Sequence, residues 1–463
     1  MKLAILGGGG VRMPKFVRAV LTASPGLFDE ISLFEPEPAR RDTICRLAAA
    51  LPEALGHPPV VTVTDDAQAA FTGADYVFSA IRVGGDRGRV IDEQVALRRG
   101  LVGQETTGAG GCAMALRTIP VVLAYCELLR RCAPDAVLIN FTNPAGLITQ
   151  AICAQGLVTA VGVCDTPGGT VARLAEFLGV SGDPELSGSY AGLNHLGWVC
   201  SLRAGGRERI GELISRFEEL RRYDHRFAAF DPALVRRAGA VPAEYVYYYY
   251  DPARYVREVA RAGTSRGQDV LALNGELLGA LSAAFARGDL AAAWSAYDTL
   301  MGVRSDTYMR TDTDGDAGQD AARRARAGTG PADLAAAAIG GYEGLALRVI
   351  GGLAGRRPAE VIVNLPAGAS LGLDPGDVVE LPARADRAGL TPLPAADLPL
   401  AARALVEQVK DYERGIVAAA LSGDADLAAV ALAGHPLVPG LTVARELIAE
   451  YRELHGADLA YLH

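Results

Sequence analysis

The sequence predicts an α/β protein in which a doubly wound parallel sheet is followed by a mixed α+β, mainly helical domain. Three observations predict this fold class. Short apolar strands alternate with helical patterns over residues 1–190, a glycine-rich turn joins the first strand to the first helix, and long helical patterns dominate residues 191–463. We therefore expect two domains with these boundaries.

Short apolar runs in the first domain have the length and β-branched content of buried strands. They span residues 2–6, 31–34, 60–64, 76–81, 136–140 and 160–164. Helical patterns lie between them, for example after Pro14, because proline is tolerated in a first helical turn, and from Ala113 to Arg131. This alternation is typical of a parallel sheet that is covered by helices on both faces.

Beyond residue 190 the pattern becomes mainly helical. Residues 190–203 predict a strand or hairpin, and residues 310–331, rich in Asp, Gly, Ala and Arg, predict an exposed loop. Helical patterns cover residues 207–222, 243–262, 268–288, 290–310 and 333–354, and two short strands lie at 361–365 and 378–381. Further helices complete the second domain.

Composition and charge narrow the class of protein. The chain has 463 residues, of which 50% are hydrophobic and 21% charged, and its formal net charge is −9. An acidic chain is a poor partner for nucleic acid or for an anionic membrane surface. No apolar run reaches the roughly 20 residues that span a bilayer, and the seven cysteines are scattered, as is typical of reduced thiols. We therefore expect a cytoplasmic globular protein.

The first strand ends in four glycines, Gly7, Gly8, Gly9 and Gly10, and the second strand ends in Glu35. A glycine turn between a strand and a helix lets the backbone approach a pyrophosphate, whose charge the helix N-terminus receives. An acid at the end of the second strand binds a ribose 2′-hydroxyl and repels a 2′-phosphate. The segment predicts a Rossmann-like site for NAD rather than NADP. A tight turn without a ligand is the alternative.

Polar residues follow two further strands, at the edge where doubly wound sheets bind ligands. Arg82 and Arg89 come after the fourth strand, and Asn143 follows the fifth. Residues 103–111 form a second glycine-rich segment, which we expect to be a loop. Capping of the next helix would explain Asn143 as well as ligand binding would.

Cys164 ends the sixth strand and opens a helix, and His195 lies in the hairpin segment that follows. A helix N-terminus lowers the pKa of a thiol, so the thiolate could serve as a ligand. A thiolate and an imidazole together suit a divalent metal and leave coordination positions open. Each residue taken alone is more often part of core packing.

Two further groups of candidate functional residues lie in the mainly helical half of the chain. Residues 245–250 contain five tyrosines, and on a helix Tyr245 and Tyr249 would share one face. An aromatic packing layer explains most of these rings. Arg266 could hold an anionic group of a substrate, or it could be a solvated helix residue.

Together these segments resemble glycoside hydrolase family 4, whose members are NAD- and metal-dependent glycosidases. The resemblance covers almost the whole chain, and its motifs occur in the same order. They are Arg82-Val83-Gly84-Gly85, Arg89 with Asp92-Glu93, Gly103-Gln104-Glu105-Thr106-Thr107-Gly108, Asn143-Pro144, Cys164-Asp165-x-Pro167, Asn194-His195, Tyr245 with Tyr248-Tyr249, and residues 361–364, 378–382 and 435–438.

The resemblance implies hydrolysis without net oxidation, because NAD would take a hydride from C3 of the sugar and later return it. A ketone at C3 acidifies the C2 proton, which Tyr245 would remove as the base if its pKa is lowered. The C1 leaving group would then be eliminated, with Asp165 protonating the leaving oxygen, and water would add back before the hydride returns to C3. Cys164 and His195 would hold a divalent metal, expected to be manganese, that stabilises the negative charge at C2 and C3.

The same resemblance implies the contacts with the ligands. Arg82 would contact the cofactor, Arg89 and Asn143 the sugar, and Arg266 a 6-phosphate. The substrate would be a phosphorylated disaccharide or glucoside, and the chain would assemble as a homodimer or homotetramer.

The chain departs from the family pattern at three places. Gly10 stands where serine or alanine is usual, and residues 364–368 lack the second asparagine of many members. Asp165 is familiar from 6-phospho-α-glucosidases, whereas the motifs around Arg82 and Glu105 favour 6-phospho-β-glucosidases. We expect a 6-phospho-β-glucosidase, with a 6-phospho-α-glucosidase as the alternative.

Two other functions fit parts of the sequence. A 2-hydroxyacid or malate-type dehydrogenase would share the glycine turn and a histidine near position 195, but it gives Cys164, Asp165 and Tyr245 no role and would release NADH. A catalytically silent NAD-dependent sugar sensor is the second. The intact candidate catalytic residues argue against it.

Overall fold

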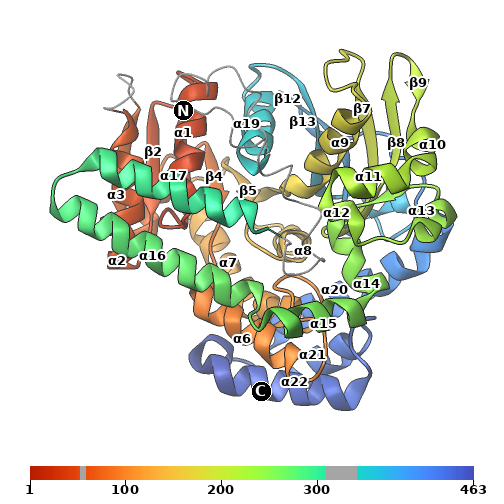
Figure 1. Cartoon of the computed structure of the whole chain (residues 1–463). Coiled ribbons are helices and arrows are strands. Elements are labelled where there is room, and N and C mark those ends of the chain that lie inside the picture. Colours follow the sequence, from red (N-terminus) through yellow and green to blue (C-terminus); the bar gives the residue numbers. More distant parts are fainter. Residues whose placement is uncertain (53–58, 309–340) are drawn as a thin grey trace.

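A mixed β-sheet of thirteen strands runs through the part of the chain that the structure describes (Figure 1). The structure is a computed structural model and describes residues 1–52, 59–308 and 341–463. The loop predicted at residues 310–331 lies outside these ranges. The sheet is parallel in its N-terminal half and antiparallel beyond it, and helices flank it, so the predicted fold class is confirmed.

Six parallel strands have the spatial order β3-β2-β1-β4-β5-β6. They are β1 (Lys2–Leu6), β2 (Glu30–Phe34), β3 (Val60–Thr64), β4 (Tyr76–Ser79), β5 (Val137–Asn140) and β6 (Thr159–Gly162). All of them lie where the sequence predicts, apart from small differences at their ends. This is the order of dinucleotide-binding sheets, in which the strand order reverses between β1 and β4. The carboxyl ends of these two strands therefore open the crevice where a ligand is expected.

Helices cover both faces of the parallel strands. They are α1 (Met13–Ala23), α2 (Pro38–Arg40), the π-helical turn η1 (Arg41–Cys45), α3 (Arg46–Ala49), α5 (Ala67–Phe71), α6 (Gly85–Leu97), α7 (Gly108–Cys132), α8 (Ala145–Gln155) and α9 (Asp165–Phe177). Helix α7 begins before the expected Ala113, so part of the predicted loop is helical. A Cβ atom at Gly110 would lie 2.3 Å from the Gln104 carbonyl oxygen, and glycine thus lets the helix pack against the preceding loop.

The central parallel strands β1, β2 and β4 are buried on both faces, whereas the edge strand β3 is largely exposed. Leu3 and Ile5 of β1 pack with Phe16 of α1 on one face, and Ala4 and Leu6 pack with helices α5 and α7 on the other. Full burial of one leucine or isoleucine side chain contributes about 1.5–3 kcal/mol. A strand buried on both faces reads as a continuous apolar run, which is why these strands could be predicted.

Antiparallel strands from the second half of the chain extend the same sheet beyond β6. They follow in the order β11 (Ala359–Pro366), β12 (Val378–Asp386), β7 (Ser187–Leu193), β8 (Leu196–Ala204) and β10 (Val241–Pro242), with β9 (Arg207–Glu208) beside β8 and β13 (Gly389–Pro392) beside β12. Asn364 of β11 pairs with Gly162 of β6. The sheet thus continues past residue 190, and the division into two domains stays a prediction.

Some helices of the second half pack around this extension, and others pack against helices of the first half. The described helices of the second half are α10 (Ile210–Ser215), α11 (Phe217–Tyr223), α12 (His225–Ala228), α13 (Pro232–Ala238), η2 (Glu244–Val246), α14 (Tyr247–Tyr250), α15 (Pro252–Ala262), α16 (Arg266–Ala286), α17 (Leu290–Asp306), α19 (Gly341–Leu353), η5 (Gly368–Leu371), α20 (Leu400–Ser422), α21 (Ala425–Ala433), α22 (Leu441–His455) and η6 (Gly456–Leu459). Those that pack against helices of the first half include α16, α17 and α22. The single helix expected at 243–262 is interrupted at Asp251, whose carboxylate caps α15 by accepting from the Arg254 N–H. Pro252 lacks the N–H that would continue α14.

Two described helices, α7 and α16, are long and apolar enough to cross a membrane by length and composition alone. In α7, 61% of the apolar window is buried inside the protein, as expected of a core helix. Helix α16 packs against α17 through Leu277 and Leu281, and the two run side by side in Figure 1.

Candidate active site

A cleft of about 1310 Å³ opens at the carboxyl ends of the parallel strands. Pockets for one small ligand are typically about 300–1,000 Å³, so this cleft has room for a dinucleotide and a sugar together. Its lining includes every predicted site residue except Gly8 and Gly9: Gly7, Gly10, Glu35, Arg82, Arg89, Asn143, Cys164, Asp165, His195, Tyr245 and Arg266. The fold therefore brings together residues that are far apart in the sequence.

The glycine turn is built by close backbone approaches. Gly7 has a φ of +94°, and a Cβ atom at Gly8 would lie 2.8 Å from the Leu33 Cβ atom. The Gly9 N–H donates to Glu35 Oε2 at 3.0 Å. At Gly10 the nearest atom to an added Cβ is 3.2 Å away. At Gly8 and Gly9 the neighbouring atoms thus leave no room for a Cβ atom. Gly10 is the glycine of the turn that best tolerates a small side chain.

Alanine at position 9 is expected to destabilise the protein. Its Cβ atom would lie 2.5 Å from Glu35 Oε2 and 2.6 Å from the Arg40 Cβ atom, and overpacking of this kind costs about 1–3 kcal/mol. Denaturant unfolding measures the change. Gly275→Ala on α16 is the matched control, because its Cβ atom would meet open space. This substitution is expected to raise the free energy of unfolding by about 0.5–1 kcal/mol, since glycine is unfavourable inside a helix. Equal stability of the two variants would contradict the packing described for Gly9.

The two predicted arginines that follow β4 share one acid. Arg82 Nη2 lies 2.7 Å and Arg89 Nη1 3.2 Å from Glu105 Oε2, and Arg89 Nε donates to Glu93 Oε1 at 2.7 Å. Burial alone would raise the pKa of Glu105, yet the two guanidinium groups hold it well below its ordinary value. Glu105 was not predicted as a site residue, although it lies inside a quoted motif.

Asn143 does not cap the helix that follows it. The N-cap residue of α8 is Pro144, whose side chain has no oxygen that could cap the helix. The Gly146 N–H in the first turn donates instead to Asn194 Oδ1 at 3.3 Å. This outcome corrects the capping alternative and leaves Asn143 as part of the cleft lining.

His195 occupies the tight turn between β7 and β8 with a φ of +62°, unlike every other non-glycine residue that the structure describes. A left-handed conformation is costly for a side chain with a Cβ atom, and such strain is often found at functional sites. Its Nδ1 atom forms a 2.6 Å hydrogen bond with Thr106 Oγ1. Burial lowers the pKa of His195 to about 4. The ring is therefore neutral near pH 7, and Nε2 is the nitrogen left for a metal.

The structure corrects the expected acidity of Cys164. The residue stands at the N-cap of α9, but burial and the nearby Glu380 and Asp165 raise its pKa well above the ordinary value. The effect of the helix N-terminus is therefore outweighed. A thiolate at this position requires a cation beside it, as a bound metal would provide.

Glu380 of β12 is a buried acid whose charge contributes to the raised pKa of Cys164. Its Oε1 atom accepts from the Asn364 amide at 2.9 Å and the Asn194 amide at 3.3 Å. Burial raises its pKa to about 8. The unfolded chain loses this proton near pH 4.5 and the folded chain near pH 8, so this carboxyl weakens folding increasingly as the pH rises between the two values.

Glu380→Gln is therefore expected to stabilise the metal-free protein in alkaline solution. Glutamine keeps the oxygen that both asparagine amides contact, and it does not ionise. The free energy of unfolding should exceed that of the wild type by at least about 1 kcal/mol near pH 9 and should match it near pH 4. Urea titrations at the two pH values measure the difference. A variant that is less stable near pH 9 would contradict the assignment.

Cys164 and His195 remain the two predicted metal ligands. Within residues 1–52, 59–308 and 341–463, no cluster of three or more His, Cys, Asp or Glu side chains could hold a metal ion. A neutral imidazole and a buried thiol fit a divalent ion whose other positions are filled by water or substrate oxygens. The donor set thus fits a metal that acts on a bound substrate.

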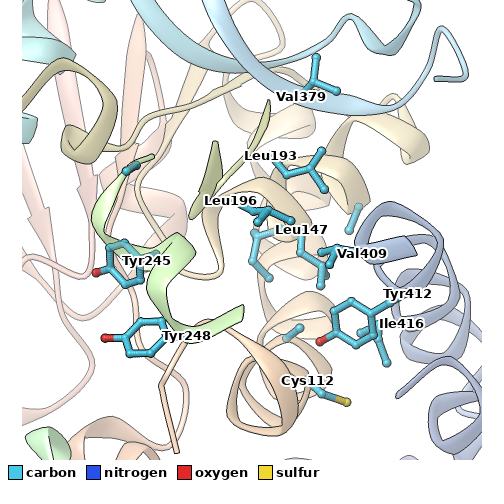
Figure 2. Packing of buried hydrophobic residues seen from close by; sticks show 14 of the residues in the cluster. Cys112, Leu147, Leu193, Leu196, Tyr245, Tyr248, Val379, Val409, Tyr412 and Ile416 are labelled. Atoms are coloured by element: carbon cyan, nitrogen blue, oxygen red, sulfur yellow. The ribbon is translucent and has the colours of Figure 1, made fainter. Parts of the chain in front are cut away.

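Tyr245 lies flat on the His195 ring, with the ring centroids 3.8 Å apart and the planes parallel. Figure 2 shows the hydroxyl groups of Tyr245 and Tyr248 on the same side, away from the core residues Leu147 and Leu196. The Tyr308 hydroxyl donates to Tyr245 Oη at 2.9 Å. Burial raises the pKa of Tyr245 well above its ordinary value. The protein alone therefore does not lower this pKa, and a bound cation would be needed.

Arg266 contacts the end of α17. Its Nη1 donates to Thr307 Oγ1 at 2.8 Å and its Nη2 to the Arg304 carbonyl at 2.8 Å. Arg304 Nη1 donates to Asn274 Oδ1 at 3.0 Å. Burial and the charges of Arg12, Arg89 and Arg266 lower the pKa of Arg304 to about 9. These arginines line the same cleft, so this end of it attracts an anion.

Models of one family match both halves of the chain. The family 4 glycosyl hydrolase model matches residues 2–180, and the model of the family 4 glycosyl hydrolase C-terminal domain matches residues 190–438.

Sequences that are named as enzymes of both anomeric types are similar to the chain. A probable 6-phospho-beta-glucosidase of Bacillus subtilis is 27% identical over 99% of this chain and 97% of that protein. The 6-phospho-alpha-glucosidase 1 of Lacticaseibacillus paracasei is 31% identical over 43% of this chain and 46% of that protein.

Solved structures share the fold. A 6-phospho-beta glucosidase structure from Thermotoga maritima with manganese, NAD+ and glucose-6-phosphate superposes with a TM-score of 0.78 at 23% identity, and the match covers 100% of both chains. Together with the two family models, these similarities confirm the resemblance read from the sequence: the chain belongs to family 4 of the glycosyl hydrolases.

Proposed function

We propose that this glycosyl hydrolase cleaves 6-phospho-β-glucosides and uses NAD and a divalent metal, expected to be manganese. One observation carries the proposal: a single cleft contains the glycine turn, the Cys164–His195 pair and Tyr245 together. A dehydrogenase would use the glycine turn and a histidine, but it would give Cys164 and Tyr245 no role. Cleavage of 6-phospho-α-glucosides is the alternative, because relatives of both kinds are similar to the chain.

The residues of the turn fit a dinucleotide. Gly7 and Gly10 would face the pyrophosphate at the start of α1, and Arg82 would contact the cofactor deeper in the cleft. The carboxylate of Glu35 accepts from the Gly9 and Glu37 N–H groups at 3.0 Å each. Its negative charge would repel a 2′-phosphate, which favours NAD over NADP.

The chain's own groups would move two protons. When bound, NAD supplies reversible oxidation at C3 and the metal polarises the C2 and C3 oxygens. Tyr245 would take the proton from C2, and the hydrogen bond from Tyr308 would stabilise the phenolate before that step. Asp165, at the start of α9, would protonate the leaving oxygen. Arg89 and Asn143 would hold the sugar.

The 6-phosphate would bind where arginines gather. Arg266 was expected there from the sequence, and Arg304 joins it from α17. Within the described part of the chain, Arg304 makes no ion pair with an acid, whereas Arg89 has Glu93 and Glu105 as partners. A phosphate would supply the missing counter-charge for Arg304. Arg304 is thus a second candidate for the 6-phosphate beside Arg266.

Cytoplasmic location and assembly as a homodimer or homotetramer stay predictions. Light scattering of the purified protein measures its mass in solution and tests the second of them.

The deciding experiment offers purified protein, NAD, manganese and a reductant to p-nitrophenyl 6-phospho-β-glucoside, its α-anomer and unphosphorylated p-nitrophenyl glucoside. We expect nitrophenol release from the phosphorylated β-anomer without accumulation of NADH. Release that persists after NAD has been removed would overturn the proposal. Stoichiometric NADH formation without nitrophenol would support the dehydrogenase instead.

A further inference from the structure

The cleft continues along α9 beyond the proposed acid. Asp165, Gly169 and Arg173 are four residues apart on this helix, a spacing that places side chains on one face. All three line the cleft. The direction from Asp165 to Arg173 is therefore a path along which a bound ligand can extend.

Two arginines and two acids are paired at the end of this path. Arg173 Nη2 donates to Glu244 Oε2 at 2.8 Å, and its Nε lies 3.5 Å from Asp224 Oδ2. Arg226 Nη1 donates to the same Asp224 oxygen at 3.0 Å. Arg173, Arg226 and Glu244 also line the cleft. The two positive and two negative charges balance, unlike the arginine-rich end near Arg304.

The two arginines of this polar wall are not fully buried. The side chains of Arg173 and Arg226 keep 21% and 24% of their surface exposed, so they can donate hydrogen bonds to a ligand in the cleft. Gly169 keeps space in front of the wall, because a Cβ atom there would lie 3.1 Å from Arg173 Nη1. When a ligand covers charged groups of this kind, they lose their hydrogen bonds to water. A ligand that offers hydrogen bonds in their place is therefore favoured.

We propose that the wall formed by Gly169, Arg173, Arg226 and Glu244 is the leaving-group subsite, and that it selects a neutral, polyhydroxylated group, that is, a second sugar. The inference rests on the proposed function, because it takes Asp165 as the acid that faces the leaving oxygen. Since Cys164, His195 and Tyr245 would hold the glucosyl part, the other product must extend along α9. A flat aromatic group would desolvate the ion pairs without forming hydrogen bonds to them.

The test compares two substrates that share the 6-phospho-β-glucosyl part. One is a disaccharide with glucose as the leaving group, and the other is phenyl 6-phospho-β-glucoside. In the wild type, we expect a higher kcat/KM for the disaccharide. In Arg173→Met, the disaccharide value should fall at least about tenfold more than the phenyl value, because hydrogen bonds to a charged group are lost.

Two variants keep the test independent of folding. Arg173→Lys retains the charge and should recover part of the preference for the disaccharide. Arg130→Met removes an arginine from an exposed ion pair on α7 and should leave the ratio of the two kcat/KM values unchanged. Equal losses on both substrates in Arg173→Met, or a wild-type preference for the phenyl substrate, would overturn the inference. If the wild type cleaves neither substrate, the proposed function fails and the subsite falls with it.

Discussion

Tyr245→Phe is expected to lower kcat for hydrolysis of 6-phospho-β-glucosides by about two to four orders of magnitude, the usual contribution of a positioned base. The substitution removes the oxygen that would take the C2 proton and that accepts the hydrogen bond from Tyr308. The ring and its stacking on His195 are retained. Loss of the base can thus be separated from loss of packing.

The measurement follows solvent deuterium at C2 of the released sugar as well as the rate. Wild-type protein should place deuterium at C2 during turnover, and Tyr245→Phe should slow this exchange together with hydrolysis. Tyr250→Phe is the matched control, because Tyr250 belongs to the same run of tyrosines but is 37% exposed. Exchange at the wild-type rate in Tyr245→Phe would show that another group is the base.

The positions of the strands and of the glycine turn could be predicted because they depend on local patterns. Leu3 to Leu6 form an apolar run that ends in glycines, and this pattern alone indicates a strand and a strand-to-helix turn. Arg82, Arg89, Asn143 and Cys164 could be placed near this turn because each follows or ends a predicted strand, whereas the catalytic roles of Asp165 and Tyr245 came only from the family resemblance. Spacing in the sequence does not indicate which loops meet in space.

The electrostatic environment of the site could not be predicted. Cys164 was expected to be acidic because it opens α9, but Glu380 reaches it from β12, which is much later in the chain. Tyr308 and Arg304 were missed for a similar reason. They lie near the end of α17, and nothing in their local sequence distinguishes them from ordinary residues of an amphipathic helix. Their contacts with Tyr245 and Asn274 exist only in the folded chain.

Cys164→Ala is expected to weaken manganese binding and to lower hydrolysis at least about 100-fold, since loss of a direct ligand should cost no less than the 10–100-fold typical of its outer-shell partners. The metal would then be held by His195 alone among the proposed protein ligands. Titration of manganese followed by electron paramagnetic resonance measures affinity independently of activity. Cys132→Ala is the matched control, because this free cysteine at the end of α7 does not line the cleft.

Serine at position 164 separates ligation from packing. Serine fills nearly the same space as cysteine, but its hydroxyl is a poorer ligand than a thiolate for a divalent metal of this kind. If Cys164 acts by binding the metal, Cys164→Ser should resemble Cys164→Ala in manganese affinity while keeping wild-type thermal stability. If Cys164 is only a buried packing residue, Cys164→Ser should bind manganese and hydrolyse substrate as the wild type does. That result would show that Cys164 is not a metal ligand and that manganese binds elsewhere or through His195 and other groups.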